Sequence, residues 1–498
     1  MESIRSYIMK KNRLISLFLA SILMSAAMTA CGGDDTGTAD TTPDTAGSAA
    51  ETEAADDDIF AQRMKEADNL PEKDFGGRTF RLLNDGHAGS FAEQDGDVVN
   101  DAIYSRNLTV QERFNITLED LNQGTGDATK AFVVQAVNAG DDAFDLVMTH
   151  SITAGDLALE DYYLNWYDIP HIDFTRPWWA ATTRENLSVD DVCPLAIGDY
   201  ALMSYGQTVC MYFNKQLIEN YDLPDPYQLV REGKWTYPTL ISLTRDIYED
   251  KNLDGAMDAG DLYGVSLDAM NRVNMFYWAF DNPLMAVENG ELKITYRTEK
   301  LTAFITALNN DFYTNPGCVV NTEFKETALP DFTAGNVVFQ FGMFRDATWI
   351  RGMEDDFGIL PLPKWEEAQE NYYSYSSGSA PVLAVPTTAS DLEFIGIITE
   401  AMNAESYKQV VPVYYETALK DKYARDEETL EMIDLVMQGR FVDIGFIYDG
   451  FVGAGYIPAR LVQKNDSNVE SYIEKNEKAI NKRYDQIIEY FTNYKDTH

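Results

Sequence analysis

Oxygen-bearing side chains recur through residues 250–261 with the spacing of an EF-hand-type calcium loop. The residues at loop positions 1, 3, 5, 7, 9 and 12, which would supply the calcium ligands, are Asp250, Asn252, Asp254, Ala256, Asp258 and Asp261. Calcium takes six to eight oxygen ligands, and the sharp turn of such a loop needs glycine at position 6, which is Gly255 here. The sequence therefore predicts a structural calcium ion, and a solvated acidic turn is the alternative.

Catalytic side chains form no recognisable pattern. The four histidines are His87, His150, His171 and His498, and the chain lacks H-E-x-x-H, G-x-S-x-G, Walker A and complete G-x-G-x-x-G motifs. These absences favour a protein without enzymatic activity. Because glycoside hydrolysis needs only two well-placed carboxylates and the chain is rich in them, a glycoside hydrolase is the alternative from another class.

The chain is strongly acidic, with a formal net charge of −42 at pH 7. Nucleic-acid binding needs a basic surface, so the charge argues against a nucleic-acid partner. Anionic lipid headgroups would also repel the chain, so a membrane attachment would have to use a lipid rather than charge. We interpret the acidity as solubility in an exposed location.

Four cysteines are present: Cys31, Cys193, Cys210 and Cys318. If Cys31 is modified, three remain, so at least one thiol is unpaired. A Cys193–Cys210 disulfide is one possibility in an exported protein, and buried free thiols are the other.

Strand and helix patterns alternate through residues 79–148. The strand patterns are 79–83, 116–121 and 144–148, and the helical patterns between them are 99–114 and 131–137. This alternation predicts a mostly parallel sheet flanked by helices, and ligands bind such sheets beyond the carboxyl ends of their strands. The residues expected at that edge are Asn84, Asp85, Thr149, His150 and Ser151. Near the C-terminus, apolar residues of 472–491 recur on one face of a long predicted helix.

The first thirty residues have the order of a secretory signal. Basic residues at 10–13 precede an apolar run over 14–28, which is shorter than the ~20 residues of a membrane-spanning helix. Residues 28–31, Met-Thr-Ala-Cys, resemble the bacterial lipobox, which predicts lipidation of Cys31. Residues 31–58 follow as a linker with nine acidic residues and no aromatic or basic residue, a composition typical of a flexible tether. An ordinary cleaved signal peptide is the alternative.

Several later segments together resemble the extracellular solute-binding family 1, the carbohydrate ABC transporter substrate-binding lipoproteins that include the maltose-binding protein. The matching segments are 144–148 with 155–159, 196–200, 211–215, 225–227, 233–236, 332–339 and 357–363. Their order and spacing carry the resemblance, which spans most of residues 75–400.

The resemblance implies an α/β, two-lobed periplasmic-binding-protein type II fold with a hinge between the lobes. The expected division is a signal peptide (1–30), an acidic linker (31–58), the first part of the N-terminal lobe (59–195), mainly the C-terminal lobe (196–378), and hinge crossings with a helical part shared between lobes (379–498). It also implies a non-enzymatic protein on the outer face of the bacterial cell membrane, which delivers a carbohydrate to an ABC permease. A single lipid tether favours a monomer.

Sugar recognition needs aromatic rings for the apolar faces of a pyranose and polar groups for its hydroxyls. Aromatic clusters occur at 162–166, 178–179, 277–280, 344–349 and 372–375, with core packing as the alternative for each. By position in the family pattern, Trp278 is the expected stacking residue. The other expected ligand-binding residues are Asn84, Asp85, Thr149, His150, Ser151, Tyr205, Asp281, Phe344, Arg345 and Asp346. Two further alternatives are a surface glycan-binding protein without a permease and the same fold binding a non-sugar solute.

Overall fold

The computed structural model describes residues 62–86, 89–258, 260–268, 272–321, 328–350, 352–415 and 426–497. They belong to one compact unit, Ile59–His498. The predicted signal peptide, Cys31 and the acidic linker lie outside the described residues. Within the described ranges, no helix is both long enough and apolar enough to cross a bilayer.

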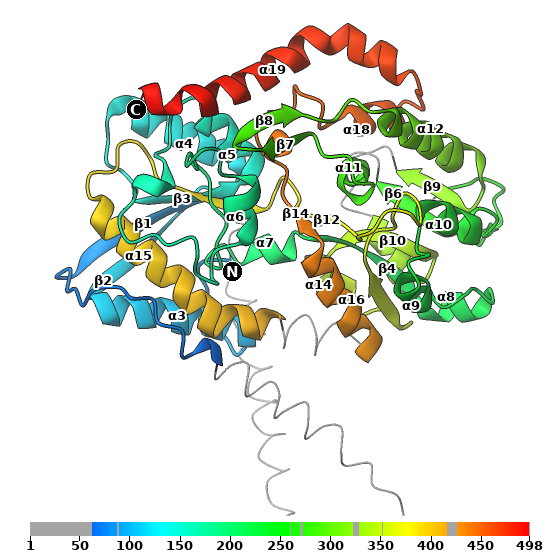
Figure 1. Cartoon of the computed structure of the whole chain (residues 1–498). Coiled ribbons are helices and arrows are strands. Elements are labelled where there is room, and N and C mark those ends of the chain that lie inside the picture. The colour runs from blue at the N-terminus through cyan, green and yellow to red at the C-terminus, as the bar shows by residue number, and fades with distance from the viewer. Residues whose placement is uncertain are drawn as a thin grey trace, which may run out of the picture. The chain divides into compact units, whose positions relative to one another are not determined.

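The first lobe is built on a four-stranded sheet with the order β13-β3-β1-β2 (Figure 1). Its strands are β1 (Arg78–Asn84), β2 (Ile116–Asn122), β3 (Leu146–His150) and β13 (Pro381–Ala384). β1 is parallel to both β2 and β3, which confirms the predicted parallel arrangement, and β13 runs antiparallel to β3. The surrounding helices are α3 (Val98–Phe114), α4 (Gly126–Ala139), α5 (Ser151–Ala158) and α15 (Leu392–Glu405).

Local sequence signals set the ends of these helices. The Asp97 carboxylate accepts hydrogen bonds from the backbone of the first turn of α3, and Thr125 caps α4 in the same way. Each helix ends at a residue in the left-handed region, Asn115 after α3 and Gly140 after α4. These caps leave the buried faces of α3 and α4 free to pack on the sheet.

The second lobe is built on a six-stranded sheet with the order β11-β4-β10-β6-β5, in which β9 also pairs with β6. Its strands are β4 (Val209–Asn214), β5 (Tyr248–Glu249), β6 (Leu262–Asp268), β9 (Cys318–Asn321), β10 (Val337–Met343) and β11 (Phe357–Leu360). Every residue of β4, β6 and β10 is buried, as expected for strands covered on both faces.

Helices of the second lobe, with the segments that join it to the first, complete the central part of the chain. They are α6 (Ala181–Asn186), α7 (Met203–Gly206), α8 (Lys215–Asn220), α9 (Pro226–Arg231), α10 (Tyr237–Thr244), α11 (Phe276–Ala279), α12 (Glu299–Thr314), α13 (Ala328–Thr333) and α14 (Ala347–Ile350). Two small ribbons are also present, β7 (Met285–Glu288) with β8 (Glu291–Ile294), and β12 (Ser374–Tyr375) with β14 (Arg440–Phe441).

The C-terminal part of the chain is helical and contacts both lobes. α15 packs on α3 in the first lobe, whereas α16 (Glu427–Gln438) packs on β11 in the second. α17 (Ile444–Ile447) and α18 (Ile457–Val462) follow, and then α19 (Val469–Thr497), which confirms the predicted C-terminal helix. In Figure 1, α19 extends over helices of both lobes. Arg297 of the second lobe contacts Glu470 at the start of α19, and Asp156 of α5 contacts Arg483 farther along it.

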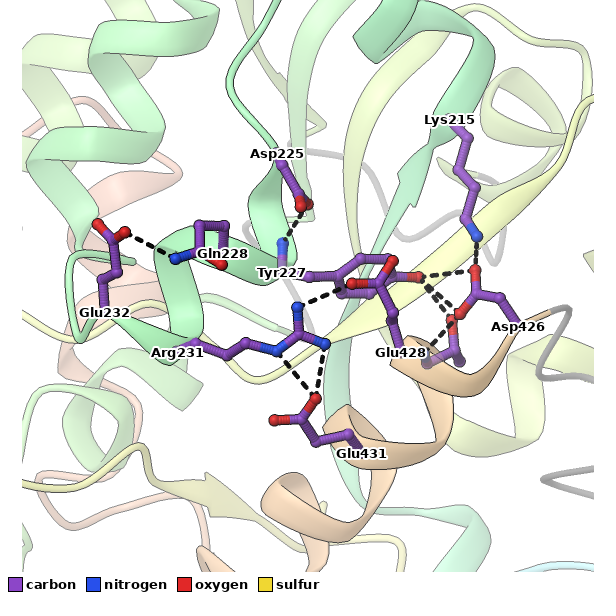
Figure 2. Close-up of polar contacts among 10 residues, drawn as sticks. Lys215, Asp225, Tyr227, Gln228, Arg231, Glu232, Asp426, Glu428 and Glu431 are labelled. Carbon is purple, nitrogen blue, oxygen red and sulfur yellow. Dashed lines mark hydrogen bonds and ion pairs between the residues drawn. The ribbon is translucent and has the colours of Figure 1, made fainter.

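Ion pairs attach α16 to α9 of the second lobe (Figure 2). Arg231 of α9 contacts Glu428 at 2.8 Å and Glu431 at 2.7 Å, one turn apart on α16. Tyr227 adds a buried hydrogen bond to Thr429 at 2.6 Å, and Lys215 of α8 pairs with Asp426, the N-cap of α16. The buried hydroxyl pair stabilises this attachment more than the exposed ion pairs do, because water screens the latter.

The three later cysteines are buried free thiols. Cys193 lies in the core of the first lobe, and Cys210 and Cys318 lie in strands of the second-lobe sheet. Of the two possibilities for Cys193 and Cys210, the structure therefore has free thiols rather than a disulfide.

The first lobe contains a buried carboxyl group, Glu400 of α15. Its two oxygens accept hydrogen bonds from the indole N–H groups of Trp178 (2.8 Å) and Trp179 (2.9 Å). Burial raises the pKa of Glu400 to about 7, although the two indole hydrogen bonds lower it. Between its ordinary pKa and 7, the folded protein therefore holds a proton that the unfolded chain has released.

We predict that the loss of this proton makes the protein less stable as pH rises. The contribution of Glu400 is full below its unfolded pKa and is lost as pH rises to about 7. Substituting Glu400→Gln should therefore make the fall in Tm between pH 5 and pH 8 smaller by several degrees. Glu393→Gln on the same helix is the control, because this carboxyl is half exposed and its pKa is lowered by Lys73. Equal pH slopes for the two variants in thermal unfolding would contradict the prediction.

Candidate functional site

The carboxyl ends of β1 and β3 are joined by one buried carboxylate, that of Asp85. Its Oδ2 atom accepts hydrogen bonds from the Thr149 hydroxyl (2.8 Å) and the His150 backbone N–H (2.9 Å), and it lies 3.7 Å from the His150 Nε2 atom. Asn84 is also buried, and its side chain contacts Asp120 and the backbone N–H of Gly86. The predicted residues therefore do lie together at this edge. The side chains of Asp85 and Asn84, however, form hydrogen bonds with neighbouring groups of the protein and so hold the strand ends in place.

Ser151, the next residue along, lines a pocket between the lobes. Its backbone N–H donates to the Ala380 carbonyl at 2.9 Å, and its hydroxyl donates to the Gly378 carbonyl at 3.1 Å. The remaining lining comes from both lobes and the segments between them: Ile197, Trp278, Tyr375, Ser376, Ala380, Val382, Val442, Asp443, Phe446 and Ile447. The space in the pocket that a water molecule can reach is about 10 Å³, which is room for about one water molecule.

Trp278 of α11 forms the aromatic wall of this pocket. Its ring stacks on Tyr375, with the centroids 4.2 Å apart and the planes 22° apart, and it meets the edge of Phe446 at 4.8 Å. The indole N–H donates to the Asp443 carboxylate at 2.8 Å. The predicted stacking residue is therefore at the pocket, in an orientation set by three neighbours.

Asp443 fixes several backbone segments around the pocket. It caps α17 by accepting from Gly445 N–H at 2.8 Å, and it accepts from Leu284 N–H at 2.6 Å. Burial raises its pKa to about 6, even though the hydrogen bonds from Leu284, Trp278 and Gly445 lower it. The carboxylate therefore holds α11, the start of α17 and the segment before β7 at one point.

A buried ion pair lies at the carboxyl ends of β6 and β10. The Arg272 guanidinium contacts Asp346 at 3.0 Å, and the same Asp346 oxygen accepts from Met343 N–H at 2.8 Å. Burial alone would lower the pKa of Arg272, but Asp346 outweighs this effect and the pKa is raised. Burial raises the pKa of the Tyr375 hydroxyl, and of the charges that also act on it Arg272 lowers the pKa and Asp268 raises it.

Some polar atoms of this edge have no hydrogen-bond partner among the described residues. They are Nη1 of Arg272, Oδ1 of Asp346 and Oε1 of Gln340, and all three are buried. A buried polar group without a partner costs about 1–3 kcal/mol, so such atoms in a folded protein are candidates for contact with a polar ligand. Donor and acceptor atoms of this kind suit a molecule with several hydroxyl groups.

Other predicted site residues occupy different surroundings. Phe344 is fully buried in an apolar cluster with Ile103 and Tyr212, because the loop after β10 coils into a short helix that directs this ring inwards. Arg345 lies over the exposed Trp349 ring, with its guanidinium carbon 5.6 Å from the centroid. Tyr205 donates to buried Asp199 at 2.7 Å.

Asp281 lies in an exposed turn after α11 with φ of 54°. It does not line the pocket that contains Trp278. Of the predicted aromatic clusters, most members are buried in the core, and Trp349 is exposed. Core packing, the alternative given for each cluster, therefore accounts for most of these rings.

Sequence reasoning did not identify three residues of this region, Arg272, Asp443 and Phe446. Arg272 follows β6 closely, so the rule that ligands bind at strand ends would have indicated it once residues 262–268 were recognised as a strand. Asp443 and Phe446 belong to no motif, and Asp443 is 165 residues from its partner Trp278. No local pattern in the sequence indicates that contact.

The predicted calcium loop has the backbone of a tight acidic turn. Gly255 has φ of 77°, and its N–H donates to Oδ2 of Asp250 at 2.9 Å. Asn252 and Asp254 each accept from a backbone N–H two residues later, and buried Asp261 accepts from the Tyr248 hydroxyl at 3.0 Å. Oδ1 of Asp250 is buried and has no hydrogen-bond partner within the described part of the chain. Across the described ranges, no three histidine, cysteine or carboxylate side chains converge on a common metal position.

No family model and no curated protein sequence matches the chain. Solved structures do match the chain in their fold. The maltose-bound MalE3 of T. maritima has a TM-score of 0.53 and 12% identity, covering 80% of this chain and 99% of its own. The Listeria monocytogenes ABC substrate-binding protein Lmo0181, in complex with cycloalternan, has a TM-score of 0.55 and 12% identity, covering 82% and 98%. The maltose-maltodextrin binding protein of Alicyclobacillus acidocaldarius has a TM-score of 0.52 and 13% identity, covering 80% and 100%.

Proposed function

We propose that the chain is a carbohydrate-binding protein that closes its two lobes on its ligand and delivers that ligand to an ABC permease. It has the α/β, two-lobed fold of the periplasmic binding proteins, with a helical C-terminal region, as the family resemblance implied. The observation that carries the proposal is the pocket between the lobes, where the stacked Trp278 and Tyr375 rings lie with the Asp443 carboxylate. The solved structures above include proteins that bind maltose and cycloalternan, which supports a non-catalytic role.

The chemistry of this pocket suits a sugar. Aromatic faces contact the C–H groups of a pyranose, while carboxylate and guanidinium groups exchange hydrogen bonds with its hydroxyls. A pocket with room for only about one water molecule admits no sugar, so ligand entry requires the lobes to separate. Hinge motion of two domains around a ligand provides that separation.

A ligand panel tests the carbohydrate proposal. We expect at least one neutral or acidic oligosaccharide to raise Tm, because a ligand that binds only the folded state stabilises it, by about 2.7 kcal/mol at a hundred times Kd. Acidic sugars belong in the panel because Arg272, which follows β6, has a buried guanidinium nitrogen without a hydrogen-bond partner among the described residues. The measurement is thermal unfolding with each sugar, followed by calorimetry and by product analysis.

Variants connect this binding to the pocket. Tyr375→Ala removes the ring stacked on Trp278 and should weaken binding at least about tenfold, the equivalent of one aromatic contact. Trp349→Ala, which removes an exposed ring that does not line the pocket, is the control and should bind as the wild type does. Circular dichroism verifies that both fold. The proposal fails if no sugar shifts Tm, or if the sugar is hydrolysed.

We further propose that Cys31 carries a lipid that anchors the protein at the outer face of the cell membrane. The support is the signal-like first thirty residues, the lipobox-like residues 28–31 and the acidic linker. Cys31→Ala should move the protein from the membrane fraction to the medium, as measured by fractionation and immunoblotting. Cys193→Ala is the control and should leave it in the membrane fraction, since Cys193 is buried in the first lobe. Retention of the Cys31 variant in the membrane fraction would contradict the proposed lipid anchor.

We also propose that residues 250–261 bind a structural calcium ion. The support is the spacing of the oxygen ligands, the turn at Gly255 and the buried Oδ1 atom of Asp250, which no described residue contacts by a hydrogen bond. Ligands would include the carboxylates of Asp250 and Asp254, and the ion would fix a loop at the surface of the second lobe without contacting sugar.

Calcium binding should appear as stabilisation. We expect Tm in millimolar calcium to exceed Tm in chelator for the wild type, and the difference to disappear in Asp250→Asn. That substitution removes the charge but keeps an acceptor for Gly255 N–H. Magnesium at the same concentration controls for charge screening. A Tm that is identical with calcium and with chelator would show that the loop is a solvated turn.

A further inference from the structure

A column of aromatic rings extends from the pocket wall to the surface. Phe446, which meets the edge of Trp278, lies 5.5 Å from Tyr456 with the planes 31° apart. Tyr456 in turn lies 4.8 Å from Phe451 with the planes 33° apart. Exposure rises along the column, from 5% at Phe446 to 54% at Phe451. The last ring is therefore backed by Tyr456 and open to solvent.

The backbone presents Phe451 in a conformation that costs energy. Phe451 has φ of 63°, a region that bulky L-residues rarely adopt, and it follows Gly450 at φ of 60°. Strain of this kind costs of the order of 1–3 kcal/mol and persists where the surroundings enforce it. Such positions concentrate at functional sites, so an exposed phenylalanine in this conformation calls for an explanation.

Anchors on both sides enforce this conformation. Asp449, which is fully buried, accepts from Gly455 N–H at 2.9 Å and so closes the loop around Phe451. Arg460 donates to the Phe451 carbonyl, and its other nitrogen contacts the Tyr472 hydroxyl at 3.2 Å. The ring is thus held in place from behind and from its own backbone, with no need for an external partner to order it.

We propose that the outer face of Phe451 is a second carbohydrate-stacking position, which contacts the distal units of an oligosaccharide whose first units lie between the lobes. This inference rests on the proposed function. A rigid ring with one face open to water is the feature that pyranose C–H groups recognise. Phe451 is separated from the Trp278 wall by only two intervening rings, Phe446 and Tyr456. Phe451 would therefore make the protein bind long oligosaccharides more tightly than short ones.

The test compares short and long ligands. Disaccharide and hexasaccharide pairs of α-1,4-glucan, β-1,4-glucan, β-1,4-mannan and β-1,4-xylan serve as probes, and Kd is measured by calorimetry. Phe451→Ala should weaken binding of the hexasaccharide about tenfold while the disaccharide Kd stays unchanged. Phe451→Tyr, which keeps the ring, should restore hexasaccharide binding.

Two controls make the outcome specific. Phe451→Gly suits the positive φ, so it removes the ring while relieving strain and should match Phe451→Ala in ligand selectivity. Trp349→Ala removes another exposed ring and should alter neither ligand. If the wild type binds a pair but the Phe451 variants change both ligands equally or not at all, this inference fails alone. If the wild type binds another sugar of the panel but none of these pairs, the inference fails alone. If it binds no sugar at all, the inference and the carbohydrate proposal fall together.

Discussion

The hydrogen bond between the Trp278 indole and the Asp443 carboxylate organises the region between the lobes. One buried carboxylate receives that indole together with the backbone N–H groups of Leu284 and Gly445, so two stretches of chain that are distant in sequence, 278–284 and 443–445, meet at one point. The stacking of Trp278 on Tyr375 and its edge contact with Phe446 depend on the ring orientation that this bond sets. Truncating Asp443 would leave a buried N–H without a partner, which is more costly than the bond's net worth.

Much of the first lobe could be predicted from sequence because its signals are local. Apolar alternation identified β1, β2 and β3, and helical periodicity identified α3 and α19. Strands that alternate with helices imply parallel pairing, which β1 makes with both neighbours. The antiparallel partner β13 was beyond this reasoning, since nothing near residues 381–384 encodes its pairing with β3. The second lobe mixes parallel and antiparallel pairs for the same non-local reason.

Site residues could be predicted only where they directly follow a recognised strand or occupy a position known from the family pattern. Ser151 and Trp278 do line the pocket, one from each lobe. Phe344 was expected to face ligand, but an aromatic residue in a loop satisfies the pattern equally well when it packs inwards against Tyr212. Asp85 shows the same ambiguity, because a carboxylate at a strand end serves either a ligand or the neighbouring strand, and here it binds Thr149 and His150. Composition cannot distinguish these uses, since both place the same residue types at the same edge.

The late position of β13 in the chain has a consequence for folding. β3 ends at His150, and its antiparallel partner begins at Pro381, so the first-lobe sheet is completed only after the whole second-lobe sheet has been synthesised. Until then the edge of β3 presents unpaired backbone groups, which are a template for pairing with other chains. Contacts between residues so far apart in sequence also slow folding, because a long loop must close first. The nascent chain therefore passes through a stage in which that edge is more open to pairing with other chains than it is in the finished protein.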